Sequence, residues 1–258
     1  MQNNHTDLEK LILKLRTFAE SNKNPEYKNP KIKNSDSISH DCPAVIPYID
    51  IGLVGYSDAF DLQLKIFDIV LQEDLPGCIL LLEHKPVITI GNSQSRKNLI
   101  SSEESLTYQG IELVQSNRGG DVTFHGPGQL VCYPIINLAK FDRDLTNFVY
   151  NLEQIIINVL DEYKIKGTRI NKIRGVFVGK NKIASIGIHV KKWITLHGFS
   201  LNVSVDLGYY KNIIACGLSD YVQISMEKLL DKKIPLSFVK ELVLKNFTAV
   251  FNVRMHKL

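Results

Sequence analysis

The segment from Arg118 to Gln129 constrains this chain most, because four glycines and a proline fall within twelve residues. It lies between two apolar runs, 111–114 and 130–136, and the pattern predicts a strand, a loop and a strand. Glycine has no side chain to hold a ligand away and reaches backbone angles that strain other residues. The N–H groups of Gly119 and Gly120 are therefore expected to face a bound carbonyl or anion.

Two interpretations of this segment remain open from the residues alone. It is either an ordinary hairpin connection, in which the glycines only satisfy turn geometry, or a ligand-binding loop with Arg118 and His125 at its two ends. The glycine spacing differs from that of dinucleotide sites, and the Gly-Lys-Ser/Thr ending of a phosphate-binding loop is missing. These residues therefore do not indicate nucleotide chemistry.

Composition limits the class of protein. The 258 residues are 44% hydrophobic with a formal net charge of +4, and the basic residues form only short clusters, so a nucleic-acid binder is not expected. No apolar run approaches the roughly 20 residues that span a bilayer, and the start lacks a secretory pattern. The four cysteines show no metal-ligand spacing. We expect free thiols and a cytoplasmic location, with an organellar one left open.

Residues 1–42 differ in composition from the rest of the chain. Apolar residues at helical spacing predict a short amphipathic helix, and the following stretch, 21–41, is rich in Asn, Lys, Ser and Pro, which predicts a flexible linker. One arginine against six acidic residues is atypical of an organellar targeting peptide. We therefore expect an N-terminal extension, 1–42, followed by a single domain, 46–255.

The expected domain alternates helices and strands and has no internal repeat. Helical periodicity and two-residue periodicity, bounded by turn residues, predict an α/β (α+β) fold. The predicted helices are 57–72, 146–164 and 236–251, and the predicted strands are 78–82, 87–90, 176–178, 183–190 and 194–205.

Two residues are candidates for chemistry. Cys216 is followed by glycine at the end of an apolar run, and Lys182 begins a strand among small and apolar neighbours. Taken singly, each has an ordinary explanation, as a small buried hydrophobe and as a lysine whose head group reaches solvent. Together they suggest a dyad, because a thiol has a reference pKa near 8.5 and a neighbouring cation favours the reactive thiolate. His84, His125 and His197 are further candidates for lining a pocket.

Three motifs resemble those of the lipoyl(octanoyl) transferases, the octanoyl-[acyl-carrier-protein]:protein N-octanoyltransferases, and the resemblance as a whole covers roughly residues 47–250. In order they are Arg118-Gly119-Gly120-x-x-Thr123-x-His125-Gly126-Pro127-Gly128-Gln129-Leu130-x-x-Tyr133, Lys182-Ile183-Ala184-Ser185-Ile186-Gly187, and His197-Gly198-Phe199-Ser200-Leu201-Asn202-Val203 followed by Cys216-Gly217. The resemblance implies a mixed β-sheet flanked by helices, as in the catalytic module of biotin and lipoate protein ligases.

The resemblance also implies roles for residues. Cys216 would take the octanoyl group as a thioester, and Lys182 would activate it. The residues that would hold the acyl chain and its carbonyl are Arg118, Gly119, Gly120, Asp121, Val122, Thr123, Phe124, His125, Ser185, Ile186, Gly187, Gly198, Phe199 and Ser200. Two positions depart from the family pattern: Ala215 stands where proline is usual, and Lys191-Lys192 where arginines are common.

Cofactors and partners follow from the same resemblance. No ATP and no metal would be needed, since the substrate arrives on the phosphopantetheine of acyl carrier protein. The acceptors would be lipoyl domains of 2-oxoacid dehydrogenase complexes and the glycine cleavage H protein, with no nucleic acid or membrane partner and a monomeric enzyme. Both protein partners are typically acidic, so docking is expected at Lys172, Arg174, Lys180, Lys191 and Lys192, unless these are ordinary solvated residues. The alternatives are an ATP-dependent ligase and a non-catalytic binding module.

Overall fold

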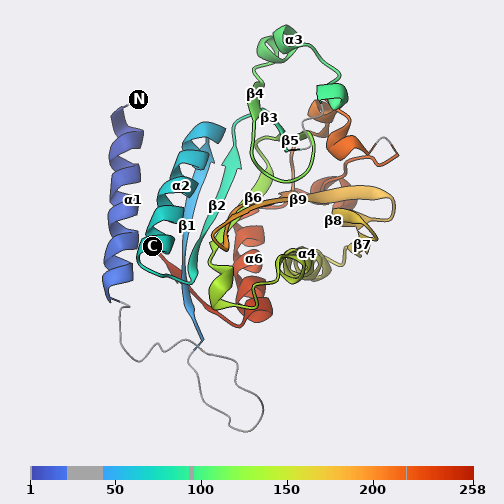
Figure 1. Cartoon of the computed structure of the whole chain (residues 1–258). Helices are drawn as coiled ribbons and strands as arrows, with labels where there is room; N and C mark the ends of the chain where they lie inside the picture. Colours follow the sequence, from blue (N-terminus) through green and yellow to red (C-terminus); the bar gives the residue numbers. More distant parts are fainter. Residues whose placement is uncertain (1, 22–42, 93–95, 219) are drawn as a thin grey trace.

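The strand β2 (Gly77–His84) is buried on both faces, which explains its uninterrupted apolar sequence. Leu80 and Leu82 pack into one hydrophobic core, whereas Ile79 and Leu81 pack into another on the opposite face of the sheet. Figure 1 shows the computed structural model, which describes residues 2–21, 43–92, 96–218 and 220–258, and in the first helix the side chains from residue 9 onward.

An eight-stranded mixed sheet, with β2 near one edge, carries the fold (Figure 1). The strand order is β11-β1-β2-β6-β10-β9-β8-β7. β1 runs parallel to both of its neighbours, and every other pairing is antiparallel. The remaining strands of this sheet are β1 (Val45–Val54), β6 (Gln129–Ile136), β7 (Thr168–Ile170), β8 (Ile173–Val178), β9 (Asn181–Lys191), β10 (Ile194–Asn202) and β11 (Arg254–Lys257).

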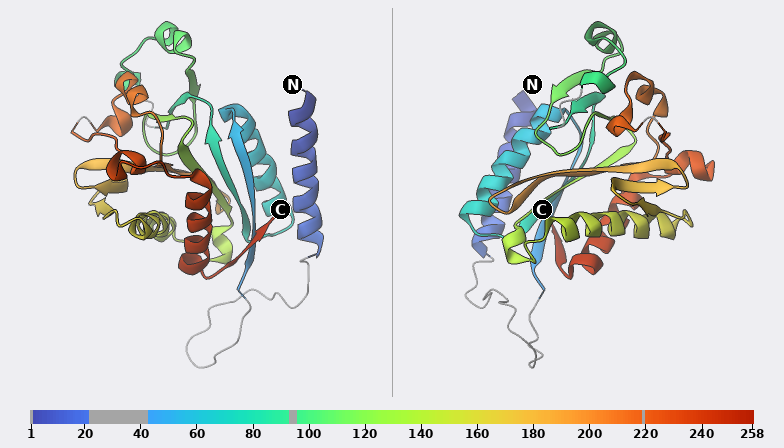
Figure 2. Two further views of the ribbon diagram at one scale, coloured as in Figure 1. Left: turned by 180° about the vertical axis from the view of Figure 1, so that it is seen from behind. Right: turned by 45° about the vertical axis from the view of Figure 1, so that its right-hand side comes forward.

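Helices cover both faces of the sheet, as the two views of Figure 2 show. α2 (Tyr56–Gln72) and α1 (Gln2–Ser21) lie on one face, and α4 (Leu145–Glu162) and α6 (Leu236–Phe251) lie on the other. The shorter helices are α3 (Glu103–Tyr108), α5 (Met226–Leu230) and the 3-10 turns η1 (Arg96–Asn98), η2 (Leu138–Lys140), η3 (Leu207–Asn212) and η4 (Ala215–Gly217). The predicted mixed sheet flanked by helices is confirmed.

A second, three-stranded sheet is built around the glycine-rich segment. Its order is β4-β3-β5, with β3 (Val87–Ile90) in the centre, parallel to β4 (Glu112–Gln115) and antiparallel to β5 (Thr123–His125). The interpretation of the segment as a simple hairpin between 111–114 and 130–136 is therefore wrong. Both flanking strands exist, but they belong to different sheets, and part of the segment forms β5 itself.

The long periodic elements and several short strands match the sequence-based expectations. The three predicted helices correspond to α2, α4 and α6, and the predicted hairpin corresponds to β8 and β9. β10 ends at Asn202 rather than at 205, because the chain then leaves the sheet and the Ser204 N–H donates to the carbonyl of Gly128 (2.8 Å). The predicted strands 78–82 and 87–90 are present, but in different sheets.

The predicted N-terminal helix is present as α1 and packs against the domain. Leu15 and Ala19 are fully buried in the core that also contains Leu62 and Ile66 of α2. The stretch predicted to be a flexible linker, 21–41, falls almost entirely outside the described residues. Among the helices that are described, none combines the length and apolar character needed to cross a membrane.

Candidate active site

The structure brings Lys182 and Cys216 together, although they are 34 positions apart in the sequence. Lys182 Nζ lies 3.2 Å from Cys216 Sγ. Only 2% of Lys182 is exposed, so the explanation that its head group reaches solvent is wrong. The ammonium also lies 5.6 Å from the centre of the Phe177 ring, within the range of a cation–π contact. A lysine that is buried beside a half-buried thiol is the arrangement expected of an activated nucleophile.

Backbone contacts fix where Lys182 enters the site. Its N–H donates to the carbonyl of Val222 (2.8 Å), and its own carbonyl accepts from the N–H of Ile224 (3.0 Å). The start of β9 is thus paired with the segment that follows Cys216 in the chain. This pairing, together with the β8–β9 hairpin, brings the two reactive side chains to the same place.

A ring of hydrogen bonds holds the cysteine turn. Cys216 has a left-handed backbone (φ 57°), which is strained for a residue with a side chain, and its N–H donates to the carbonyl of Val122 (2.8 Å). The N–H of Val122 donates to Asp121 Oδ1 (2.8 Å), and Asp121 Oδ2 accepts from Asn98 Nδ2. The carbonyl of Asn98 closes the ring by accepting from the N–H of Ile214 (2.8 Å). The turn forms with Ala215 before the cysteine.

A cavity of about 330 Å³ opens beside the sulfur. Its wall comes from the glycine-rich segment, the middle of β9, the middle of β10, the strand β6 and the cysteine turn. The lining residues are Arg118, Gly120, Asp121, Thr123, His125, Val131, Tyr133, Ser185, Ile186, Gly187, His197, Gly198, Phe199, Ser200 and Cys216. Most of the candidate binding residues therefore surround one space.

Three candidate binding residues, Gly119, Val122 and Phe124, lie behind the wall rather than in it. The Gly119 N–H donates to the carbonyl of Ile188 (3.0 Å), so the expectation that it faces a bound carbonyl or anion is wrong. Val122 contributes its carbonyl to the cysteine turn. Phe124 is fully buried, and its ring stacks on Tyr209 at 4.8 Å between centroids. These residues shape the loop from inside.

Gly198 of β10 allows this strand to approach β6 closely. A Cβ atom at this position would lie 2.0 Å from the carbonyl oxygen of Cys132 on β6 and 2.6 Å from Pro134 Cδ. Any side chain here would force β10 away from β6. Because both strands contribute to the cavity, the glycine sets the shape of its floor.

Arg118 is a buried positive charge at the edge of the cavity. Its Nε and Nη2 donate to Thr89 Oγ1 (3.0 and 2.8 Å), Nη2 also donates to the Thr89 carbonyl (2.7 Å), and Nη1 donates to the Gly119 carbonyl (3.1 Å). Burial lowers the pKa of Arg118, and the nearby Cys216 and Tyr56 oppose that shift. A guanidinium held in this way presents a fixed field to the cavity.

The three candidate histidines are neutral rings near the cavity. His84 Nδ1 donates to the Val54 carbonyl (3.3 Å), which leaves Nε2 to accept from the Tyr133 hydroxyl (2.7 Å). His125 Nδ1 lies 2.6 Å from Gln129 Oε1 and donates to it, because the amide nitrogen of Gln129 donates elsewhere. Burial lowers the pKa to about 4 for His84 and to about 3 for His125. The uncharged rings add no charge beside the cavity.

His197 combines strain with an unpaired nitrogen. It has a left-handed backbone (φ 59°), its Nε2 donates to Asn117 Oδ1 (2.6 Å), and its ring stacks on Phe60 at 5.3 Å. Burial lowers its pKa to about 3. Within the described residues, His197 Nδ1 and the neighbouring Thr123 Oγ1 are buried polar atoms without a partner. Both residues line the cavity, but these two atoms themselves are buried.

The buried histidines predict a stability that falls in mild acid. Their folded-state pKa values of about 3 to 4 lie below the usual 6.5, so between about pH 6.5 and pH 4 the unfolded chain binds more protons than the folded one. The free energy of unfolding therefore decreases as the pH is lowered through this window. We expect the urea midpoint to fall from about pH 7 to about pH 5, and the fall to be smaller in His125→Asn.

His256→Asn is the matched control for that measurement, because His256 is exposed at the C-terminal strand. This variant should keep the wild-type dependence on pH. An equal decrease in His125→Asn and in the wild type would show that the buried ring is not the titrating group.

Several residues that the structure places in or around the site were given no site role from the sequence. Val131 and Tyr133 of β6 line the cavity, and their two-residue spacing, which puts them on the same face of the strand, was a usable signal. Asn98 and Thr89 support the cysteine turn and Arg118, and each is an isolated polar residue in a short element. No sequence pattern distinguishes such residues from ordinary surface positions.

The five basic residues expected to dock acidic partners do not form one patch. Lys180 precedes the start of β9, and Lys191 ends it eleven residues later, so the two are separated by about 36 Å of extended strand. Lys191 and Lys192 lie at the β9–β10 turn, where Lys191 Nζ is 6.0 Å from the Phe67 ring of α2. The prediction that these residues dock acidic partners stays untested, and the alternative that they are ordinary solvated residues stays open.

The sheet, the cavity and the paired lysine and cysteine define an α/β protein that has the fold of the lipoate protein ligases and a buried lysine beside a thiol. Its structure resembles lipoate-protein ligase A bound with ATP (TM-score 0.66, 14% identity, covering 82% of this chain and 87% of that one) and a lipoate protein ligase from Thermoplasma acidophilum (TM-score 0.64, 14% identity, covering 84% and 88%). At this identity, the similarity shows the fold alone.

Residues 55–248 match the family described as "Lipoyl protein ligase A/B catalytic domain". The octanoyltransferase of Clostridium kluyveri is 42% identical over 205 residues, which cover 80% of this chain and 88% of that protein. The octanoyltransferase of Caldicellulosiruptor saccharolyticus is 45% identical over 206 residues, covering 79% and 88%. This chain therefore belongs to the octanoyltransferase family, whose members are acyltransferases.

Proposed function

We propose that this protein transfers an octanoyl group from octanoyl-acyl carrier protein to a lysine of lipoyl domains through a thioester on Cys216. The observation that carries the proposal is the 3.2 Å separation of Lys182 Nζ and Cys216 Sγ at the edge of the cavity. In this proposal, residues 46–255 form the catalytic unit.

The first half-reaction exchanges one thioester for another. Lys182 takes the proton of the Cys216 thiol, and the resulting ammonium stabilises the thiolate, which attacks the thioester carbonyl. The carbon–sulfur bond to the carrier breaks, and the phosphopantetheine sulfur leaves with the proton from Lys182, which returns Lys182 to the neutral amine. The negative oxygen of the tetrahedral intermediate is formed close to the fixed charge of Arg118 and the backbone of the glycine-rich segment. Because the bond formed and the bond broken are of the same kind, the step requires no nucleotide and no metal.

The second half-reaction forms an amide. The lysine amine of a lipoyl domain attacks the acyl group on Cys216, the carbon–sulfur bond breaks, and the amine proton passes to Lys182. The amide is more stable than the thioester, so this step drives the transfer to completion. Lys182 is positioned for proton transfer because it lies within hydrogen-bonding distance of the leaving sulfur.

The cavity suits a medium-length acyl chain. Its volume of about 330 Å³ falls at the lower end of the roughly 300–1,000 Å³ found for small-ligand pockets. Each methylene that leaves water contributes about 0.8 kcal/mol, so an eight-carbon chain gains several kcal/mol by entering it. Val131, Ile186 and Phe199 provide apolar wall, and the neutral histidines place no charge beside the chain.

The partners proposed are octanoyl-acyl carrier protein as donor, and the lipoyl domains of 2-oxoacid dehydrogenase complexes and the glycine cleavage H protein as acceptors. We further propose a monomeric enzyme that works in the cytoplasm. These proposals rest on the octanoyltransferase relatives, and the lipoate protein ligases of the same fold support lipoyl domains as acceptors.

The experiment that tests the proposed function compares two acyl sources. With octanoyl carrier protein and an apo lipoyl domain, we expect octanoylated lipoyl domain to form without nucleotide. With free octanoate and ATP, we expect no product, because no step adenylates the acid. Product formed only from octanoate and ATP would contradict the proposal and identify a ligase, and tight binding of the acyl group without turnover would identify a binding module.

A further inference from the structure

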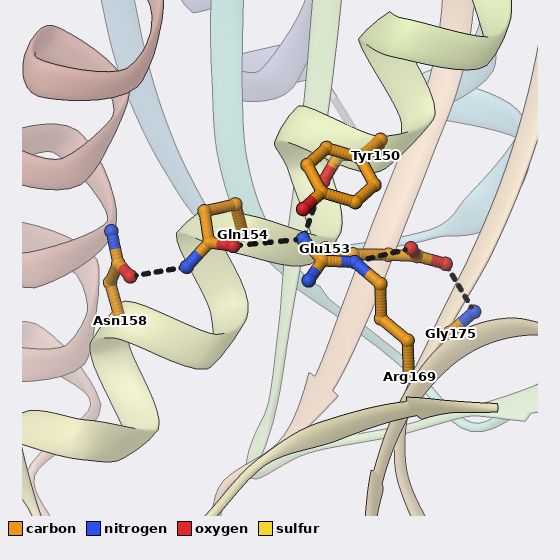
Figure 3. A network of polar contacts seen from close by, with 6 residues as sticks. All are labelled: Tyr150, Glu153, Gln154, Asn158, Arg169 and Gly175. Carbon is orange, nitrogen blue, oxygen red and sulfur yellow. Dashed lines mark hydrogen bonds and ion pairs between the residues drawn. The ribbon is translucent and has the colours of Figure 1, made fainter.

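A partly buried polar network joins α4 to the strands β7 and β8 (Figure 3). Glu153, which is 4% exposed, accepts from Arg169 Nε through Oε2 (3.0 Å) and from the backbone N–H of Gly175 through Oε1 (3.1 Å). Arg169 Nη2 donates to the Tyr150 carbonyl and to Gln154 Oε1 (3.0 Å each), and the guanidinium carbon lies 3.8 Å from the centre of the Tyr150 ring. The carboxylate thus fixes a particular stretch of strand backbone.

Gly175 is the point at which this network reaches Lys182. The glycine has φ +123°, and a Cβ atom on it would lie 2.4 Å from the carbonyl oxygen of Ala184 and 2.9 Å from Lys182 Cε. The stem of the lysine therefore packs against the bare backbone of Gly175. The pairing of β8 with β9 shifts register between Val176 and Phe177, so this backbone lies beside an irregularity in the ladder.

An irregular backbone next to a reactive side chain needs support from elsewhere. Both carboxylate oxygens of Glu153 are used, one by the Gly175 N–H and the other by Arg169. A carboxylate buried in this way is costly unless it is paired, and removing a partner leaves it uncompensated. The network is therefore a rigid support that α4 provides to the backbone against which the Lys182 stem lies.

We propose that Glu153 is a positioning residue for Lys182: through the Gly175 N–H it holds the backbone that directs the lysine ammonium to Cys216 Sγ. This inference rests on the proposed role of Lys182. Small displacements of a reacting group are expensive, since a misplacement of about 1 Å can cost on the order of 100-fold in rate. Glu153 would thus affect the reaction without contacting the substrate.

The variant that tests this proposal is Glu153→Gln. An amide has one acceptor oxygen for the two donors, Gly175 N–H and Arg169 Nε, so one of them loses its partner while the side-chain shape is kept. We expect kcat to fall about tenfold with KM unchanged, because the acyl cavity is not altered while the lysine is displaced. An unchanged kcat in Glu153→Gln would overturn the proposal.

A matched control is available on the same helix. Glu162 of α4 forms an ion pair with Lys245 (3.0 Å), and both side chains are largely exposed. Glu162→Gln therefore removes a carboxylate from the same helix without touching the site, and wild-type kinetics are expected. Arg169→Lys, which keeps the charge but loses the forked geometry, should change kcat in the same direction as Glu153→Gln. This variant keeps the proposal testable if Glu153→Gln folds poorly.

A double-mutant cycle separates positioning from general structural support. Octanoylation of Cys216 is measured in a single turnover in wild type, in Glu153→Gln, in Lys182→Ala and in the double variant. If Glu153 acts through Lys182, Glu153→Gln should slow acylation about tenfold in the wild-type background and not at all in the Lys182→Ala background. Equal slowing in both backgrounds would show a structural role only and would overturn the proposal.

The same data separate this inference from the proposed function. If the wild type forms no acyl-thioester on Cys216, the proposed function fails, and the inference fails with it. If the wild type is acylated at Cys216 and Glu153→Gln reacts at the same rate, the function stands and only the inference is overturned.

Discussion

Replacing Cys216 with alanine is expected to abolish octanoyl transfer. Among the described residues that line the cavity, Cys216 alone carries a thiol, and the substitution removes the atom on which the acyl group would be carried between donor and acceptor. Loss of the nucleophile from an enzyme of this kind costs on the order of 10⁶-fold in kcat. The measurement is the rate at which an apo lipoyl domain gains an octanoyl group from octanoyl carrier protein.

The other described cysteines provide the internal control for that experiment. Cys78 and Cys132 are fully buried in the two main cores, and burial raises the pKa of each thiol, so neither is a competing nucleophile. Cys216→Ser should be almost as inactive, since a hydroxyl beside an ammonium remains protonated. Turnover within tenfold of wild type in Cys216→Ala would exclude the thioester route.

Replacing Lys182 with methionine is expected to slow both half-reactions strongly. Methionine keeps most of the volume of the lysine stem but has no ammonium to stabilise the thiolate and no amine to accept the proton. We expect both the acylation of Cys216 and the transfer to the lipoyl domain to slow by about 10² to 10⁴-fold, the usual contribution of a general acid or base. Single-turnover rates for each half-reaction, measured separately, test this expectation.

Lys65→Met is the matched control, because Lys65 is exposed on α2 and is not among the residues that line the cavity. It should leave both rates unchanged. Lys182→Met should also unfold at a temperature equal to or above that of the wild type, because a buried ammonium costs free energy that a thioether does not. Slow kinetics accompanied by a large loss of stability would instead point to a disrupted fold.

The elements that could be predicted from the sequence are those with a clear hydrophobic periodicity. The bounds of α6 follow from its helical periodicity, and the β8–β9 hairpin from its two-residue alternation and glycine turn. β11 carries no apolar run and pairs in parallel with β1, more than two hundred positions earlier, so no local pattern could predict it. β5 is three residues long and lies inside a glycine-rich segment, where turn signals dominate.

The candidate site, too, could be predicted only in part from the sequence. Lys182 and Cys216 were identifiable as chemical types and from motifs, but their contact depends on the pairing of the Lys182 backbone with Val222 and Ile224, which no periodicity shows. The supporting Asn98 is one polar residue in a three-residue turn. Glu153 did give a signal, because it is a charged residue at a buried position of α4 next to Leu152. A charge on an apolar helix face therefore indicates a partner on a neighbouring element.

The contact between Lys182 and Cys216 is tested most directly by mass spectrometry of the full chain after mixing with octanoyl carrier protein in the absence of nucleotide. We expect the mass to increase by one octanoyl group, located on the peptide that contains Cys216. This added mass should disappear when an apo lipoyl domain is supplied and should reappear on that domain. No adduct, or an adduct on any other residue that is competent for transfer, would contradict it.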